Sequence, residues 1–413
     1  MTMILIKQEL KKIYSSPITI AALVFAIVFT TALMLFGETD YYTGNLPPLS
    51  RDGSESILRQ KRDMPYFKGE INDAWIQKYT AEEEAIASDL IKDPDNMIPE
   101  EEQNRINSER KAAGGEELEK KVFLKDEVRL QYLEKYEDFF FRSRFHEFAE
   151  AARATILADA RLSYDGKKRN AIEDKINSMF DEVSENRIYY NYNIGYHRFR
   201  NVHSFYLYTL VIVLLGGLAP MFASESMYRT DSIIFADKYG RTKDVAAKII
   251  AGFIFAISSW ILLEFINFTL TYFIYGFEGG ESVWTDWIIF ASPFTFNNFE
   301  FTAVTLLTSL AGVIYTSAFI MLVSAMCSNH FYSLGISAVV LYIVHVLFRN
   351  LILGFDPLLL LIGQDIWTGI RFNVLFDQAI PFQFTTFAVV LFICAVFVTM
   401  IYFIQKNKEI TSH

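Results

Sequence analysis

The chain has 413 residues, a net charge of −10 and only two cysteines, Cys327 and Cys394, which both lie in apolar runs. Residues 37–204 carry 34 acidic and 26 basic side chains, whereas all the remaining residues together carry 14 acidic and 12 basic ones. This composition excludes an ordinary soluble enzyme and a disulfide-stabilised scaffold, and the negative charge argues against a nucleic-acid-binding protein.

Residues 1–17 are predicted to form an amphipathic helix on the cytoplasmic surface of a membrane. Lysines lie on one face of this helix. The apolar face consists of Leu5, Ile6, Leu10, Ile13 and Tyr14.

Six stretches are apolar and long enough, or nearly so, to span a bilayer core about 30 Å thick. They are residues 18–36, 205–222, 249–275, 301–327, 331–348 and 382–404. The first could be a signal peptide, but its apolar run is long and no small-residue cleavage motif follows it, which favours a retained span. We therefore expect an all-α polytopic membrane protein with six transmembrane helices.

The charges of the connecting segments predict the orientation of these spans. The N-terminus, the loop between spans two and three and the C-terminus are rich in lysine and arginine, whereas residues 276–300 contain four acids and no base. By the positive-inside rule, both termini are expected in the cytoplasm of a bacterial cell and residues 37–204 outside its plasma membrane. Trp284 and Trp287 would then lie in the outer interfacial belt.

The charged region 37–204 is predicted to be an extracytoplasmic helical domain inserted between the first two spans. An irregular, proline- and glycine-containing stretch opens it, and helices are expected over residues 68–92, 99–112, 116–162 and 167–186. Within the third of these, apolar residues recur at helical spacing and indicate the buried face.

No motif for catalysis is present: the chain has no phosphate-binding loop, no nucleophile elbow and no cysteine pair at zinc spacing. His146 and Glu150 share a helix face and resemble part of a zinc-protease helix, but an ordinary charged surface is the favoured interpretation. Glu264, near Asn267 in the third span, and His345 in the fifth span are candidates for a translocation path, or for buried residues with a polar partner. No metal site is predicted.

Residues 350–381, before the last span, are predicted to contain an outer re-entrant hairpin. Its apolar run, residues 358–362, is too short to span the bilayer. We expect this run to be shielded by protein, the alternative being an apolar surface exposed on an outer loop.

The most specific stretch is the cytoplasmic loop between spans two and three. Thr230 or Asp231 can cap a short helix near residues 230–240 that starts at Ser232, and Gly240 suits its C-terminal turn. Ile233, Ile234 and Phe235 would then form an apolar patch surrounded by charge, which is typical of a docking surface for another protein. The alternative is an amphipathic turn lying on the membrane.

This loop resembles the coupling-helix region of ABC transporter type 2 permeases. The resemblance covers residues 1–36 and 205–413 and is a pattern of six spans with one moderately specific loop, whereas the outer domain matches in position alone. Glu264 and His330 match no motif of the family. The residues that the resemblance assigns to the ATPase interface are Glu225, Arg229, Thr230, Asp231, Ser232, Ile233, Ile234, Phe235, Tyr239 and Arg241.

The resemblance implies a permease subunit of an ATP-driven exporter without ATPase activity of its own. Two permease chains, identical or related, would pair with two ATPase subunits, which would bind ATP and magnesium, while the chain itself would hold no cofactor. Hydrophobic or amphipathic peptides or drugs are the expected substrates. A sensor or immunity protein that binds an extracellular peptide is the alternative, and an intramembrane enzyme has no motif in its favour.

Overall fold

The computed structural model describes residues 2–36, 57–58, 61–62, 64–112, 115–116, 118–185, 188–228, 230, 240–283, 294–352, 356–368 and 371–408, some of them by their backbone alone. In chain order, the elements up to residue 190 are α1 (Thr2–Ser15), α2 (Pro17–Phe36), η1 (Met64–Phe67), β1 (Gly69–Glu70), α4 (Asp73–Lys92), η2 (Pro94–Asn96), α5 (Glu100–Ala112), η3 (Lys120–Phe123), α6 (Asp126–Arg142), α7 (Phe145–Ser163), α8 (Gly166–Glu185) and β2 (Tyr189–Tyr190). They are followed by α9 (Ile194–Leu218), α10 (Pro220–Met227), η4 (Gly240–Asp244), α12 (Val245–Ile274), α13 (Asn298–Met326), α14 (His330–Ile352), α15 (Pro357–Ile362), α16 (Gln364–Thr368), β3 (Phe372–Leu375), β4 (Gln378–Pro381) and α17 (Phe382–Lys406).

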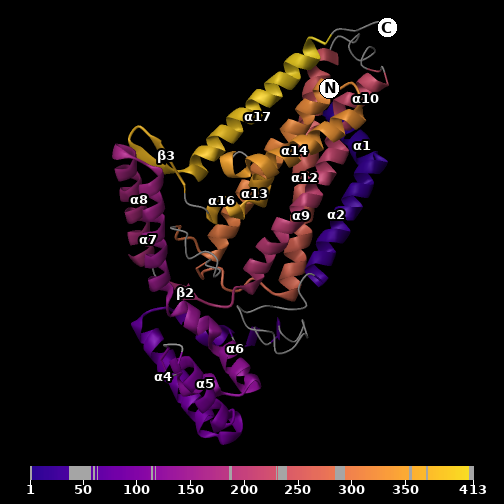
Figure 1. The fold of residues 1–413 in the computed structure, drawn as a ribbon. Coiled ribbons are helices and arrows are strands. Elements are labelled where there is room, and N and C mark those ends of the chain that lie inside the picture. Colours follow the sequence, from indigo (N-terminus) through magenta and orange to yellow (C-terminus); the bar gives the residue numbers. More distant parts are fainter. Residues whose placement is uncertain are drawn as a thin grey trace.

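Among the described residues, five helical stretches are long and apolar enough to cross a membrane. They are Pro17–Leu35, Ile194–Met227, Thr242–Ile274, Asn298–Met326 and Phe382–Lys406. The prediction of an α-helical membrane protein is therefore confirmed in this general form. The remaining predicted span forms α14, whose described apolar part, His330–Val346, is shorter. Figure 1 shows these helices in one bundle, with α1 and the C-terminal end of α17 at the same end.

The second apolar stretch is longer than the sequence suggested, because α9 begins at Ile194 and not near Phe205. Its first turns carry polar side chains that are buried in the bundle. Arg200 Nη1 donates hydrogen bonds to Asn298 Oδ1 and Thr302 Oγ1, each over 3.2 Å. Since these groups are satisfied inside the protein, they do not need to reach water. A search for uninterrupted apolar residues misses such a segment.

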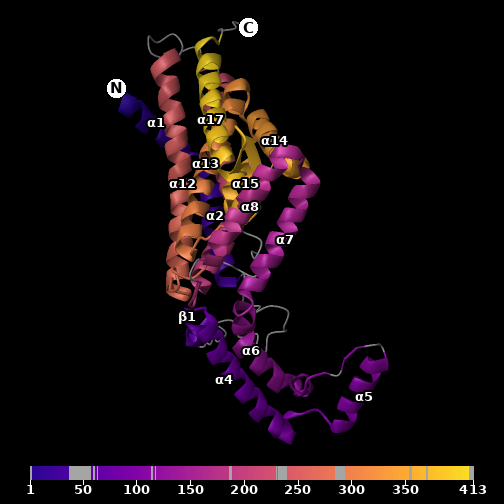
Figure 2. The same cartoon turned by 90° about the vertical axis from the view of Figure 1, so that its left-hand side faces the viewer.

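The described residues between 64 and 190 form a helical region that begins beyond the bundle end opposite α1 and the last turns of α17, and α7 and α8 turn back along the bundle (Figures 1 and 2). Three of its predicted helices agree with α4, α5 and α8 to within five residues at each end. The predicted single helix over 116–162 is wrong. Leu124 is extended and bridges to Met97, and a turn at Ser143–Arg144 separates α6 from α7.

An aromatic core holds this region together. Phe67, Trp75, Tyr79, Tyr136 and Phe139 are all buried, and their rings contact one another with centroid distances between 4.9 and 6.4 Å. The Trp75 indole N–H donates to the Phe67 carbonyl over 3.0 Å, so the polar end of the ring is also satisfied. Strand β1 pairs with β2, which ties the beginning of the region to its return toward the bundle.

Glu83 is a carboxylate buried beside this core. Its Oε1 lies 3.8 Å from Lys121 Nζ and has no hydrogen-bond partner among the described residues. Burial raises the pKa of the Glu83 carboxyl above its ordinary value of 4.5, and the Lys121 ammonium opposes that shift in part. The Glu83 carboxyl of the folded region therefore stays protonated at pH values at which it is already ionised in the unfolded chain.

The contribution of Glu83 to stability should be complete below pH 4.5 and should be lost as the pH rises through the raised pKa. We expect Glu83→Gln to remove this dependence and to stabilise the region by about 1 kcal/mol at neutral pH. Hydrogen-exchange protection of α4 in the full chain, compared with the unmodified protein at each pH, would measure it. The exposed neighbour Glu84 provides the control variant Glu84→Gln, and equal pH profiles for both variants would contradict the prediction.

The apolar run before the last span forms α15, which is buried against α13. Leu359, Leu360, Leu361 and Ile362 are all buried, so the alternative of an apolar surface exposed on a loop is wrong. Gly312 of α13 makes the contact close: a Cβ at this position would lie 2.6 Å from the Leu361 nitrogen and 2.7 Å from the Leu360 carbonyl carbon. Only a glycine permits this approach of two backbones.

We therefore expect Gly312→Ala to lower the free energy of unfolding by about 2 kcal/mol, because the new methyl group must displace backbone atoms of α15. Gly335, inside α14, has nothing within 4 Å of an added Cβ, so Gly335→Ala should stabilise the chain by up to about 1 kcal/mol through helix propensity. Denaturant titration in detergent would compare them. A Gly312→Ala variant as stable as Gly335→Ala would show that α15 does not pack as described.

Candidate functional site

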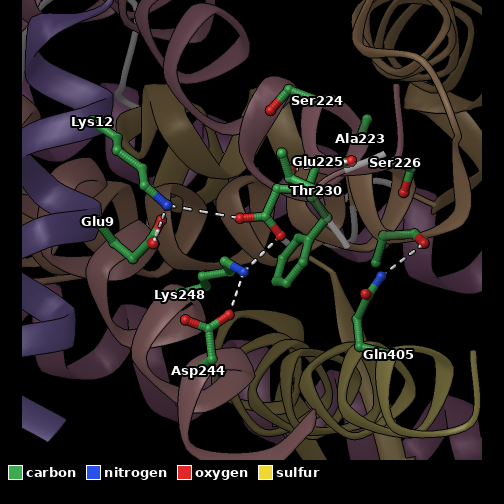
Figure 3. Close-up of polar contacts among 12 residues, drawn as sticks. Glu9, Lys12, Ala223, Ser224, Glu225, Ser226, Thr230, Asp244, Lys248 and Gln405 are labelled. Carbon is green, nitrogen blue, oxygen red and sulfur yellow. Dashed lines mark hydrogen bonds and ion pairs between the residues drawn. The ribbon is translucent and has the colours of Figure 1, made fainter. Parts of the chain in front are cut away.

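The candidate site is a cluster of five charged side chains at the bundle end where α1 and the last turns of α17 lie: Glu9, Lys12, Glu225, Asp244 and Lys248 (Figures 1 and 3). We call it the Glu225 cluster. Glu225 Oε2 accepts a hydrogen bond from Lys248 Nζ over 2.7 Å, and Lys248 also pairs with Asp244. Lys12 Nζ lies 2.6 Å from Glu9 Oε1 and 3.7 Å from Glu225 Oε1. The cluster therefore joins α1, α10 and the beginning of α12.

Burial makes these ion pairs important for the structure. The Lys248 side chain is only 3% exposed, and the side chains of Glu225 and Asp244 are 16% and 15% exposed. A buried lysine needs its carboxylate partners, because an isolated charge in a low-dielectric interior is costly. Lys12 is the exposed edge of the cluster, with 61% of its side chain accessible.

Helix α10 carries Glu225 and is fixed at its own beginning. Pro220 occupies its first turn and cannot donate a backbone hydrogen bond, so the long apolar helix is interrupted after α9. The first backbone N–H groups of α10 have no partner within the helix, and Ser324 of α13 supplies one. Its Oγ accepts hydrogen bonds from the Phe222 and Ala223 N–H groups and donates one to the Ala219 carbonyl. The position of Glu225 is therefore set from α13.

Helix α1 packs against α12 through most of the predicted apolar face. Ile13 is buried and Leu10 packs on the bundle core, while Leu5 and Ile6 are half-buried. Tyr14 is more exposed, but its hydroxyl lies 2.5 Å from Ser258 Oγ and its ring meets Phe255 edge-on. The apolar face predicted from spacing thus includes the contacts of α1 with the bundle.

A cavity of about 460 Å³ lies beside the Glu225 cluster. Its walls include Glu9 and Lys12 of α1, Gly216 and Gly217 of α9, and Ser224 of α10. Thr230 also lines it, and its N–H donates to the Glu225 carbonyl over 2.9 Å, which closes the last turn of α10. The cavity is therefore located where the predicted coupling segment leaves the bundle.

The predicted interface residues fall partly outside the described chain. Glu225 and Thr230 lie at the site as given above, and Arg241 is described by its backbone within η4, immediately before α12. Outside the described residues lie Arg229, Asp231, Ser232, Ile233, Ile234, Phe235 and Tyr239, and also Trp284 and Trp287. The segment 231–239 is nevertheless attached at both ends to helices that meet in the Glu225 cluster.

Glu264 and Asn267 both connect α12 to α9. The carboxylate Oε1 of Glu264 lies 2.6 Å from His203 Nδ1, and the Asn267 amide donates to the Phe199 carbonyl over 2.9 Å. His203 Nε2 and Glu264 Oε2 have no hydrogen-bond partner among the described residues. The sequence analysis assigned residues 37–204, and with them His203, to the outer domain, and it did not identify His203 as the partner of Glu264. A carboxylate within a membrane span requires a polar partner, and this requirement was the sequence signal that could have led to a search for one.

His345 of α14 and Asp356 form a second polar contact. His345 Nδ1 lies 2.7 Å from Asp356 Oδ2, while Asp356 Oδ1 accepts from the Leu358 N–H and caps α15. His146 and Glu150 are exposed on α7, where Glu150 lies 3.5 Å from Arg153. Among the described residues, no group of three or more His, Cys, Asp or Glu side chains is arranged so that it could hold a metal ion.

Three acidic and two basic side chains therefore link three helices around the two points where residues 231–239 leave and rejoin the bundle. Comparison of the chain with protein families, with curated proteins and with solved structures gives no match.

Proposed function

We propose that the chain is the membrane-spanning permease subunit of an ATP-driven exporter of the ABC type 2 class. In this proposal α14 is also a span, the fifth of six in chain order. Both termini and residues 230–240 face the cytoplasm of a bacterial cell, and residues 37–204 lie outside. A separate ATPase subunit docks on the coupling segment, and a second permease chain completes the transport unit. The substrate is a hydrophobic or amphipathic compound such as a peptide or drug.

The observation that carries this proposal is the Glu225 cluster. Glu225 precedes the coupling segment, residues 230–240, and Asp244 and Lys248 follow it, so the ion pair Glu225–Lys248 closes the base of the loop. A displacement of the loop by a partner would therefore act on α10 and α12 together. Lys12 extends the connection to α1, which supports a concerted movement of these helices.

The first experiment tests the partner. The chain is expressed with its neighbouring genes and purified by a tag in mild detergent, and the proteins that accompany it are identified by mass spectrometry. We expect a protein with an intact phosphate-binding loop, whose ATP hydrolysis depends on this chain. Recovery of the folded chain with a sensor kinase, and without an ATPase, would support the peptide-sensing alternative.

The second experiment tests the docking surface. The double variant Ile234→Asp and Phe235→Asp places two charges on the apolar patch and should abolish coupled ATP hydrolysis and transport, while membrane insertion is retained. The matched control is Ile4→Asp with Met3→Asp, two exposed positions at the beginning of α1. ATP-dependent transport that is unchanged in the first double variant would disprove the assignment of the coupling segment.

A further inference from the structure

The cavity beside the Glu225 cluster has the size of a small-molecule site. Its volume of about 460 Å³ lies within the range of about 300 to 1,000 Å³ that is usual for ligand pockets. Residues of α1, α9 and α10 form its walls, so a bound molecule would contact all three helices. Lys12 and Tyr228 line the cavity and are both exposed, so it opens to the surface beside them.

Two carboxylates in the lining are already spaced to share one ammonium group. Lys12 Nζ lies 2.6 Å from Glu9 Oε1 and 3.7 Å from Glu225 Oε1 (Figure 3). The carboxylate side chains are only 8% and 16% exposed, whereas the Lys12 side chain is 61% exposed and has room to turn toward water. The Lys12 ammonium therefore occupies a position that the ammonium of another molecule could take.

The charge of the lining favours a cation over an anion. Among the described residues that line the cavity, Glu9 and Glu225 are the acids and Lys12 is the base, which gives a net charge of −1. A phosphate or carboxylate ligand would meet two fixed carboxylates at close range. The lining therefore repels anions and attracts cations.

The break between α9 and α10 adds a backbone acceptor to the same wall. In a continuous helix the Gly216 carbonyl would accept from the N–H of residue 220, but Pro220 has no N–H. The hydrogen bond that this carbonyl accepts from Thr19 Oγ1 is long, at 3.4 Å. Gly216 and Pro220 both line the cavity, and a carbonyl oxygen has two lone pairs, so a ligand N–H can bond to it.

Apolar groups complete the lining. Ile13 and Met221 belong to the walls, and Tyr228 lies at the opening. A primary ammonium has three N–H donors, which match the two carboxylates and the Gly216 carbonyl. A quaternary ammonium has none and would leave these acceptors without a partner. The lining is therefore complementary to a primary amine that carries a short apolar body.

We propose that this cavity binds a primary ammonium group attached to an apolar body. The ligand ammonium replaces Lys12 Nζ between Glu9 and Glu225, and the apolar body packs on Ile13 and Met221. Its source is a soluble amphipathic amine or the ethanolamine headgroup of a phospholipid, since both carry the same ammonium. This inference concerns binding to the chain itself and does not require an ATPase, transport or a second chain.

Equilibrium dialysis of radiolabelled phenethylamine against the full chain in phosphatidylcholine nanodiscs tests the binding, with empty nanodiscs as the blank. We expect saturable binding that unlabelled phenethylamine displaces and that 2-phenylethanol, which lacks the ammonium, does not displace. Absence of saturable binding, or equal displacement by the alcohol, would overturn the proposal.

Charge variants test the position of the ammonium. Glu9→Gln should weaken binding about tenfold, because a charge-assisted hydrogen bond is lost. Lys12→Gln should strengthen it about threefold or more, because the competing ammonium is removed. The distant exposed variant Glu84→Gln should leave the affinity unchanged. Weaker binding by Lys12→Gln would contradict a cation site.

A steric pair keeps the test independent of the ion pairs. Ser16 lines the cavity and its neighbour Ser15 is exposed and does not, so Ser16→Trp should block binding and Ser15→Trp should not. Equal affinities of these two variants would show that the amine binds elsewhere. Phosphatidylethanolamine added to the nanodiscs then separates the sources: a lower apparent affinity for phenethylamine identifies the lipid headgroup, and an unchanged affinity identifies a soluble amine.

Discussion

Lys248→Met is expected to lower the free energy of unfolding by about 3 kcal/mol, because it leaves two buried carboxylates without their common partner. Lys248 pairs with Glu225 and with Asp244, and its side chain is almost fully buried. Methionine retains the apolar stem, so the loss comes from the charge and its hydrogen bonds. Denaturant titration of the purified chain in detergent would measure the difference.

Two further variants separate this effect from a general loss of packing. Lys11 is exposed on α1, so Lys11→Met should change the stability by less than about 0.5 kcal/mol. Adding Glu225→Gln to Lys248→Met removes one of the two carboxylate charges that lost Lys248 and should recover part of the loss. If Glu225→Gln lowered the stability of Lys248→Met by as much as it lowers the stability of the unmodified chain, the two residues would not be coupled.

His203→Leu should destabilise the bundle by about 3 kcal/mol, because the buried Glu264 carboxylate would lose its imidazole partner. The double variant His203→Leu with Glu264→Leu should recover most of this loss, since two apolar side chains of similar volume replace both members of the pair. Free energies of unfolding measured in the same detergent for the two single variants and the double variant give the coupling energy.

The control for this cycle is Tyr208→Leu, which changes a half-exposed side chain on the same helix α9 and should have a small effect. His203→Gln retains a hydrogen-bond donor and should lose less than His203→Leu. If the effects of His203→Leu and Glu264→Leu were additive, the contact between α9 and α12 would contribute nothing beyond its separate side chains. A role of Glu264 in translocation would then have to be sought from transport measurements alone.

Local sequence patterns were sufficient to predict features that depend on one helix alone. Long apolar runs predicted the membrane character, and the 3.6-residue spacing of Leu10 and Ile13 predicted the face of α1 that packs on the bundle. Glycine and proline breaks also placed α5 and α8, because these residues interrupt helices through local backbone restrictions.

Patterns failed where a polar group depends on a distant partner. Arg200 and His203 appeared to belong to the outer domain, since charge alone suggested exposure to water, yet they bond to α13 and α12 inside the bundle. The break between α6 and α7 was missed for a different reason, because the residues before it form a continuous helical pattern and contain no glycine or proline. Sequence spacing does not show which remote atoms satisfy a buried group.

The amino-acid sequence by itself determined that the chain enters a membrane as helices and carries one large charged region, because both follow from local hydrophobicity and charge. Only the tertiary structure decided that Glu225 pairs with Lys248, Glu264 with His203 and Gly312 with the backbone of α15. Each of these contacts joins segments that are distant along the chain. Their geometry depends on how the helices pack together and cannot be obtained from any one of them.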